Sequence, residues 1–135
     1  MRDQVFLDSG IFVALMSRRD HWHAQAAALF SGDEVRWSTS LLVISETYSW
    51  FLHRMGEEAA RTFRSMVSNL DGLRVFEATH VHDRDVSRML DRYRGSKLTY
   101  VDASSLVFIE GHKIKRVWST DHHLGLTGAE VLPRS

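Results

Sequence analysis

The stretch Val5-Phe6-Leu7-Asp8-Ser9-Gly10 is the most informative part of the sequence. Three large apolar residues in a row, without polar alternation, predict a strand buried on both faces, as in the centre of a parallel sheet. The apolar residues 11–16 that follow favour a helix. Asp8 is therefore expected at the carboxyl end of a central strand, where open α/β sheets bind their ligands.

A second interpretation of Asp8 is that it caps the following helix. Asp and Ser are common at this position because their side-chain oxygens accept the free backbone N–H groups of the first turn. The choice between a cap and a functional carboxylate depends on whether other acidic residues converge on Asp8.

The composition is that of a soluble globular protein. The 135 residues suffice for one domain with a substantial core, and we expect a single domain over residues 1–135. The sequence has 17 Lys and Arg against 17 Asp and Glu, so the net charge is zero. The overall charge therefore does not indicate a nucleic-acid partner, and any basic surface must be local.

The expected cellular setting follows from features that the sequence lacks. There is no cysteine, which excludes disulfides, cysteine-ligated zinc and thiol nucleophiles. Residues 1–4 do not resemble a signal peptide, and no apolar run approaches the ~20 residues of a membrane helix. We expect a cytoplasmic protein with no membrane association.

Strands and helices are expected to alternate along the chain. Strands are predicted at Val5–Leu7, Val35–Ser38, Leu73–Phe76, Ile114–Ser119 and Glu130–Leu132, and helices at Ile11–Ser17, His21–Phe30, Leu41–His53, Glu57–Leu70, His80–Arg94 and Asp102–His112, with a short turn or helix at Asp121–Gly125. This alternation predicts an α/β protein, a three-layer α/β/α sandwich around a short-stranded, mainly parallel central sheet.

Glu46 is the second informative acidic residue. It lies within the predicted helix and shares a helical stripe with the apolar residues Leu42, Val43 and Trp50. A carboxylate on a buried face is costly unless it is paired or binds a cation. A salt bridge to an arginine at the helix edge and a functional role are both open.

Asp102 and Asp121 also lie where elements meet. Thr99 and Asp102 have the spacing of a capping box, and Asp121 follows a predicted strand, so each can be a helix cap. Four independent caps remain an alternative for Asp8, Glu46, Asp102 and Asp121. Four oxygen ligands around a hard cation such as Mg²⁺ or Mn²⁺ explain the set more economically.

These residues lie in an ordered series of motifs: Phe6-Leu7-Asp8-Ser9, Ser45-Glu46-Thr47, Leu98-Thr99-Tyr100-Val101-Asp102-Ala103 and Ser119-Thr120-Asp121-His122-His123-Leu124. The series resembles a PIN domain, the nuclease fold of VapC-type toxins and related ribonucleases. The resemblance implies that Asp8, Glu46, Asp102 and Asp121 form the catalytic, metal-binding site for Mg²⁺ or Mn²⁺, and that Ser9 is the hydroxyl residue beside the first acid. Leu124 departs from the family pattern, which often has an aromatic residue there, and Gly10 stands where many toxin members have another residue.

The resemblance also implies a function and partners. The expected activity is metal-dependent cleavage of RNA, mostly single-stranded, leaving a 5′-phosphate and a 3′-hydroxyl. If the protein is a toxin, a small antitoxin protein would block its groove. A homodimer is expected from the family, with Trp50 and Phe51 as candidate exposed aromatic residues.

Basic residues form two groups in the sequence. Arg88, Arg92, Arg94 and Lys97 precede Asp102, and Lys113, Lys115 and Arg116 form the second group. A charged helix face is usually only solvated. In a nuclease the first group, with Ser9, can hold substrate RNA, and we assign Arg92, Arg94 and Lys97 to phosphate binding.

Three rival interpretations remain. A zinc site is disfavoured by the histidine spacing, although His122 or His123 can touch metal or substrate; a plain surface role is the simpler expectation for both. A non-catalytic PIN-fold module that binds nucleic acid or protein is the alternative function. A phosphatase with an aspartyl nucleophile would need a second Asp at the position of Gly10.

Overall fold

The computed structural model describes residues 3–32 and 34–134. At its centre is a five-stranded sheet in which the strand order is β3-β2-β1-β4-β5 and every pairing is parallel. The strands are β1 (Gln4–Leu7), β2 (Arg36–Ser40), β3 (Arg74–Phe76), β4 (Arg116–Trp118) and β5 (Glu130–Leu132). The predicted parallel sheet is confirmed.

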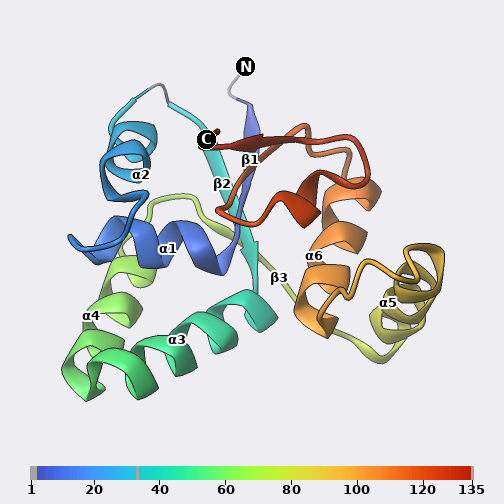
Figure 1. Ribbon diagram of the computed structural model, residues 1–135, viewed down its shortest axis with the longest axis horizontal. Helices are drawn as coiled ribbons and strands as arrows, with labels where there is room; N and C mark the ends of the chain where they lie inside the picture. Colours follow the sequence, from blue (N-terminus) through green and yellow to red (C-terminus); the bar gives the residue numbers. More distant parts are fainter. Residues whose placement is uncertain (1–2, 33, 135) are drawn as a thin grey trace.

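Helices cover both faces of this sheet. They are α1 (Ser9–Met16), α2 (His23–Phe30), α3 (Leu41–Met55), α4 (Glu57–Ser68), α5 (His80–Arg92) and α6 (Tyr100–Gly111), followed by the 3₁₀ helix η1 (His122–Gly125). Figure 1 shows α1 to α4 on one side of the strands and α5 and α6 on the other. This arrangement confirms the three-layer α/β/α sandwich.

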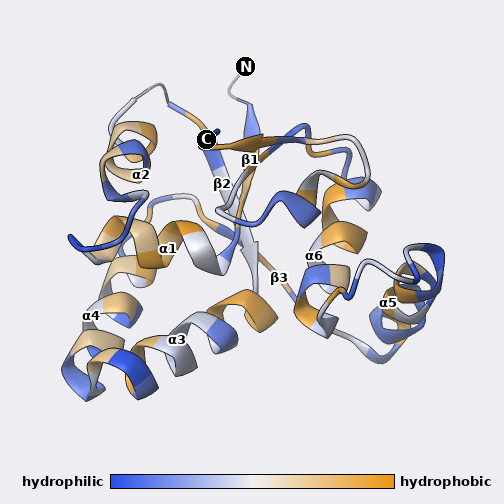
Figure 2. Cartoon of the chain, in the orientation of Figure 1, coloured by the Kyte–Doolittle hydropathy of each residue, from blue (hydrophilic) through white to orange (hydrophobic). Residues whose placement is uncertain are grey.

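The central position of β1 follows from its apolar sequence. Val5, Phe6 and Leu7 are all fully buried, as expected for a strand covered by helices on both faces. The most apolar segments in Figure 2 include this strand, α1 and the inward side of α6, whereas α5 is strongly hydrophilic along its outer side. The core therefore lies on both sides of β1.

One expectation about the surface is wrong. Phe51 is only 1% exposed, and its ring packs 5.5 Å from that of Phe63 between α3 and α4. Trp50, its neighbour, is half-buried. Because α4 covers Phe51, the two aromatic residues do not form one exposed face, although their rings are in contact. Phe51 therefore does not contribute to a dimer surface.

The strand order creates a topological switch point beside β1. The chain proceeds from β1 to β2 and β3 on one side, then returns through α5 and α6 to place β4 on the other side of β1. Ligands of open α/β sheets bind in the crevice at the carboxyl ends of such strands. The residues that follow β1 and β4, Asp8 and Ser119 to Asp121, lie at this position.

No helix within the described residues is both long and apolar enough to cross a membrane.

Candidate active site

Asp8 is a buried carboxylate and does not cap α1. It occupies the N-cap position, but its side chain makes no capping hydrogen bond and is only 4% exposed. Ser119 Oγ donates a hydrogen bond of 2.7 Å to Asp8 Oδ2. The capping interpretation of Asp8 is therefore wrong, and its carboxylate is available for another role.

Burial raises the pKa of the Asp8 carboxyl from 3.8 to about 7. The hydrogen bonds from Ser119 and Ser9 lower the pKa, while the negative charges of Glu46 and Asp102 raise it further. The charges of two acids from different helices, α3 and α6, therefore act on the Asp8 carboxyl. A cation next to Asp8 would lower the pKa of its carboxyl and favour the ionised form.

Glu46 reaches the site from α3. This helix begins directly after β2, where Ser40 Oγ accepts a hydrogen bond of 3.1 Å from the N–H of Val43. The half-buried Glu46 accepts a hydrogen bond of 2.7 Å from Ser9 Oγ and makes no salt bridge to an arginine in the described chain. Ser9 therefore connects the elements that carry Asp8 and Glu46.

Asp102 has two roles in the structure. It forms a reciprocal capping box with Thr99, with distances of 3.1 Å in both directions, so the capping interpretation is confirmed. The cap also explains why α6 begins at Tyr100, two residues before the predicted start. Only one of the carboxylate oxygens, Oδ2, accepts this bond, which leaves Oδ1 for the site.

Asp121 and His123 lie beside Asp102. One ligand atom from each of these three side chains lies within 4.8 Å of the other two. Asp121 Oδ1 accepts a hydrogen bond of 3.0 Å from the backbone N–H of His123, and the His123 Nδ1 lies 3.0 Å from the same oxygen. The His123 ring is half-buried beside the acidic cluster, whereas His122 is exposed.

The residues present fit a divalent metal ion. Asp102 and Asp121 lie together with His123, Ser119 links Asp8 to the Asp121 backbone, and Ser9 binds Glu46. In the described parts of the chain no lysine or arginine forms an ion pair with any of these four acids. Such a cluster is repulsive unless a cation compensates it. Carboxylate oxygens suit both Mg²⁺ and Mn²⁺. An imidazole nitrogen binds the softer Mn²⁺ better than Mg²⁺.

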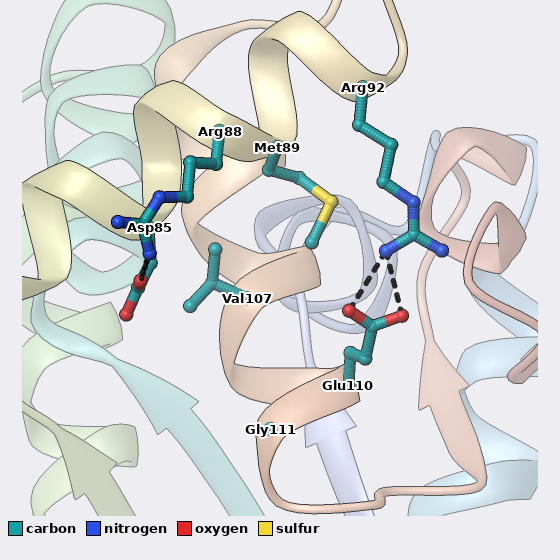
Figure 3. Close-up of a pocket in the computed structure, with 7 residues that line it drawn as sticks. All are labelled: Asp85, Arg88, Met89, Arg92, Val107, Glu110 and Gly111. Carbon is teal, nitrogen blue, oxygen red and sulfur yellow. Dashed lines mark hydrogen bonds and ion pairs between the residues drawn. The ribbon is translucent and has the colours of Figure 1, made fainter.

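The predicted phosphate-binding residues lie outside this cluster. Arg92 forms an ion pair with Glu110, 2.9 Å from each carboxylate oxygen, in a hollow of about 290 Å³ between α5 and α6 (Figure 3). Arg94 is highly exposed and only loosely paired with Asp91 at 3.9 Å, and Lys97 is exposed in the loop before α6. Arg94 and Lys97 therefore offer less neutralised charge than Arg92.

Thr120 lies so close to Gly10 that there is little room for a side chain at this position. A Cβ atom at Gly10 would lie 2.2 Å from Thr120 Oγ1, because the first turn of α1 packs against the loop that carries Asp121. An aspartyl nucleophile two residues after Asp8 would not fit this position without moving that loop. The geometry disfavours the phosphatase interpretation and explains this departure from the family pattern.

The structure is an α/β protein with a cluster of acidic residues at its switch point that could hold a metal ion. The family model described as PIN domain matches residues 5–129, and the chain belongs to the PIN domain family. A comparison with curated proteins found no match.

Solved structures give the same result for the fold. VapC20 of Mycobacterium tuberculosis, described as a sarcin-ricin loop cleaving toxin, is 25% identical, with 96% of this chain and 99% of that chain covered and a TM-score of 0.86. A toxin–antitoxin complex from Klebsiella pneumoniae is 15% identical, with 96% of both chains covered and a TM-score of 0.70. PAE2754 of Pyrobaculum aerophilum is 22% identical over 97% of this chain and 90% of that chain, with a TM-score of 0.63. At the two lower identities the likeness concerns the fold alone.

Proposed function

We propose that the protein is a metal-dependent endoribonuclease that hydrolyses phosphodiester bonds of single-stranded RNA with Mg²⁺ or Mn²⁺. The observation that carries this proposal is the convergence of four carboxylates, without a lysine or arginine partner in the described chain, at the ligand-binding edge of the sheet. Membership of the PIN domain family, which includes nucleases, supports it.

Asp8, Glu46, Asp102 and Asp121 are the proposed metal-binding and catalytic residues, with His123 as a fifth contributor. A divalent ion held by them would activate a water molecule and neutralise charge that builds up on the phosphate. Ser9 and Ser119 orient Glu46 and Asp8 through hydrogen bonds of 2.7 Å each. Because ligands must be deprotonated, the raised pKa of Asp8 makes binding release a proton near neutral pH.

The substrate is proposed to lie across the acidic edge. Arg94 and Lys97, and more weakly the paired Arg92, contact its phosphates, and Ser9 faces the reacting group beside Asp8. Attack by water on phosphorus forms a new P–O bond and breaks the P–O3′ bond, so the 3′ oxygen leaves as a hydroxyl and the phosphate stays on the 5′ end. A single strand is proposed as substrate because proteins read RNA mainly through unpaired segments whose backbone and bases are accessible.

The proposed biological setting is a toxin–antitoxin pair. A likeness to a solved toxin–antitoxin complex supports a small antitoxin protein as partner, and a homodimer and a cytoplasmic location are part of the same proposal. An antitoxin that covers the acidic edge would inhibit the enzyme without changing its fold.

The test is a cleavage assay on mixed-sequence single-stranded RNA with Mn²⁺, Mg²⁺ or EDTA. Wild type is compared with Asp8→Asn and with Asp71→Asn, a control that makes the same chemical change in an exposed turn. We expect metal-dependent cutting by wild type and the control, and none by Asp8→Asn. Cleavage that persists in EDTA or in Asp8→Asn would refute the proposal, and inactivity of folded wild type across diverse RNAs would favour the binding-module alternative.

A further inference from the structure

The edge of the sheet opposite the acidic cluster is basic. At the amino ends of the strands, where the N-terminus lies in Figure 1, there is a hollow of about 440 Å³. His112, Lys113, Lys115 and Arg116 line it together with a single carboxylate, that of Asp3. Since β1 and β4 are parallel and in register, this hollow and the acidic cluster lie at opposite ends of the same strands.

The turn between α6 and β4 separates this hollow from a second one. Lys113 and Lys115 also line a neighbouring hollow of about 240 Å³, which extends towards the residues before β5. Both lysines are exposed, so their ammonium groups can reach a ligand that occupies either hollow. The turn therefore presents positive charge over a broad concave surface and not at a single point.

The carboxylates in the two hollows are already paired. Asp3 lies 3.3 Å from an Arg116 nitrogen, and Glu110 is bound by Arg92. In contrast, neither Lys113 nor Lys115 forms an ion pair with any residue in ranges 3–32 and 34–134. The positive charge of the two lysines is therefore not compensated by the described chain.

Arg74 extends the basic surface to the far side of β2. It begins β3, and its guanidinium carbon lies 4.7 Å from the centre of the Phe76 ring. The same ring stacks with His112 at 4.4 Å, which connects Arg74 to the wall of the larger hollow. Burial and the nearby charge of Arg74 lower the pKa of His112, as expected for a region of positive potential.

A purely structural explanation covers only part of this surface. Basic residues near the carboxyl end of a helix stabilise it through the helix dipole, which accounts for Lys113 just after α6. It does not account for Lys115, just before β4, or for Arg74 at the start of β3. Arg74 pairs at the level of Phe6 and Val117, two positions beyond the amino end of β1, so the charge extends from the amino edge towards the middle of the sheet.

We propose that this surface, which we call the amino-edge surface and define by Arg74, Lys113 and Lys115, binds the phosphate backbone of RNA away from the site of cleavage. Charges spread over separate elements match a chain of phosphates better than one small anion. The acidic edge repels a polyanion when no metal is bound, and the protein has zero net charge, so basic residues at the opposite edge add to the attraction that Arg94 and Lys97 supply. The choice of RNA as ligand rests on the proposed function. The positive charge of the surface is observed independently of that function.

The test measures binding without cleavage. Fluorescein-labelled poly(U) is titrated with the full chain in EDTA, by fluorescence anisotropy, at several salt concentrations between about 50 and 200 mM. Wild type is compared with Lys113→Gln/Lys115→Gln and with Arg61→Gln/Arg64→Gln, which removes the same charge from a hollow of about 350 Å³ on α4. Thermal unfolding verifies that each variant is folded. If the double variant is not folded, the single variant Lys115→Gln provides a second test.

We expect the lysine double variant to bind poly(U) roughly five- to tenfold more weakly and to reduce the slope of log affinity against log salt by about 1.4. The single Lys115→Gln variant should reduce the slope by about half as much. The α4 control should bind as wild type does. Unchanged binding by a folded lysine variant, an equal loss in the control, or no binding by wild type would overturn the proposal.

Competition identifies the class of ligand. Unlabelled poly(U) should displace the labelled RNA, whereas poly-L-glutamate and inorganic phosphate should displace it much less effectively. Equal displacement by poly-L-glutamate would assign the surface to an acidic protein and refute RNA binding there. The cleavage assay with Asp8→Asn is independent of this result. Poly(U) binding through the lysines with no cleavage of any RNA would refute the proposed function and leave the amino-edge surface in place.

Discussion

Ser119 Oγ and Asp8 Oδ2 are joined by a hydrogen bond of 2.7 Å between residues that are 111 positions apart in the sequence. The same Ser119 oxygen accepts a hydrogen bond of 2.9 Å from the backbone N–H of Asp121. One buried hydroxyl therefore fixes the first acid of the cluster relative to the loop that carries the last. This relationship exists because β1 and β4 are adjacent in the sheet.

Ser119→Ala is expected to weaken metal binding and to raise the pKa of Asp8 further, because the carboxylate loses a hydrogen bond that lowers its pKa. Leaving the buried oxygen without this donor costs about 1–3 kcal/mol when Asp8 is ionised. The measurements are Mn²⁺ affinity by calorimetry and its dependence on pH.

The control for this prediction is Ser105→Ala. Ser105 Oγ is buried and has no hydrogen-bond partner among the described residues, so its removal breaks no bond. Equal effects of the two serine substitutions on metal affinity would contradict the positioning role of Ser119.

Asp8→Asn is expected to stabilise the metal-free protein at neutral and higher pH. With a pKa of about 7 when folded and an ordinary value of 3.8, Asp8 binds a proton in the folded state that the unfolded chain has already lost between these pH values. Its contribution to folding stability therefore decreases as pH rises from about 4 to about 7. The gain from the substitution is at most about 4 kcal/mol above that range and vanishes below it.

Urea unfolding of both proteins in EDTA, at intervals from about pH 4 to about pH 8, measures this difference. A stability difference that does not change with pH would show that the Asp8 carboxyl titrates in the ordinary range. Saturating Mn²⁺ should reverse the order at neutral pH, because only wild type retains the full set of carboxylates.

His123→Ala is expected to reduce Mn²⁺ affinity by about 10- to 100-fold, whether the ring binds the ion or orients Asp121. Mg²⁺ affinity should fall less, because an imidazole is a poorer ligand for the harder ion. The matched control is His122→Ala, since His122 is the exposed neighbour. Calorimetric titration of each variant with both metals gives the comparison. An unchanged ratio of Mn²⁺ to Mg²⁺ affinity would show that the ring orients Asp121 and does not bind the ion, and an unchanged Mn²⁺ affinity would contradict both roles.

Gly10→Ala is expected to destabilise the fold by about 1–3 kcal/mol, because the new methyl group would lie 2.2 Å from Thr120 Oγ1. Thr120→Ala in the same chain removes that oxygen and should restore most of the loss. Gly111→Ala is the control, since a Cβ there meets no atom within 4 Å. Urea unfolding of the double-mutant cycle measures the coupling, and strictly additive effects would argue against the contact.

Arg94→Gln and Lys97→Gln are each expected to raise the KM for single-stranded RNA severalfold with little change in kcat. Arg92→Gln should have a smaller effect, because Glu110 already neutralises the Arg92 charge. Steady-state kinetics at low and high salt provides the test, since phosphate contacts lose their effect as salt increases. A larger effect of Arg92→Gln than of the other two would show that the ion pair opens when RNA binds.

Much of the fold could be predicted from local patterns. The run Val5–Leu7 identified the central strand, and the alternation of short strands and amphipathic helices identified the three layers. The start of α6 differed because Thr99 caps the helix at Tyr100. Helix α1 begins at Ser9, two residues before the predicted start, without a side-chain cap from Asp8. The placement of Phe51 was wrong, because helix α4 covers the side of α3 that this residue occupies.

The sequence by itself determined which residue types are available: four acids at element junctions or on an apolar helical face, and no cysteine. Spacing and residue order are sufficient for that, because caps and periodicity depend on neighbours within a few positions. The tertiary structure alone decided that Asp8 is not a cap, that Ser119 and Ser9 orient the carboxylates, and that His123 joins Asp102 and Asp121. These contacts depend on which strands become neighbours, and strand order is set by packing of the whole chain and not by any local segment.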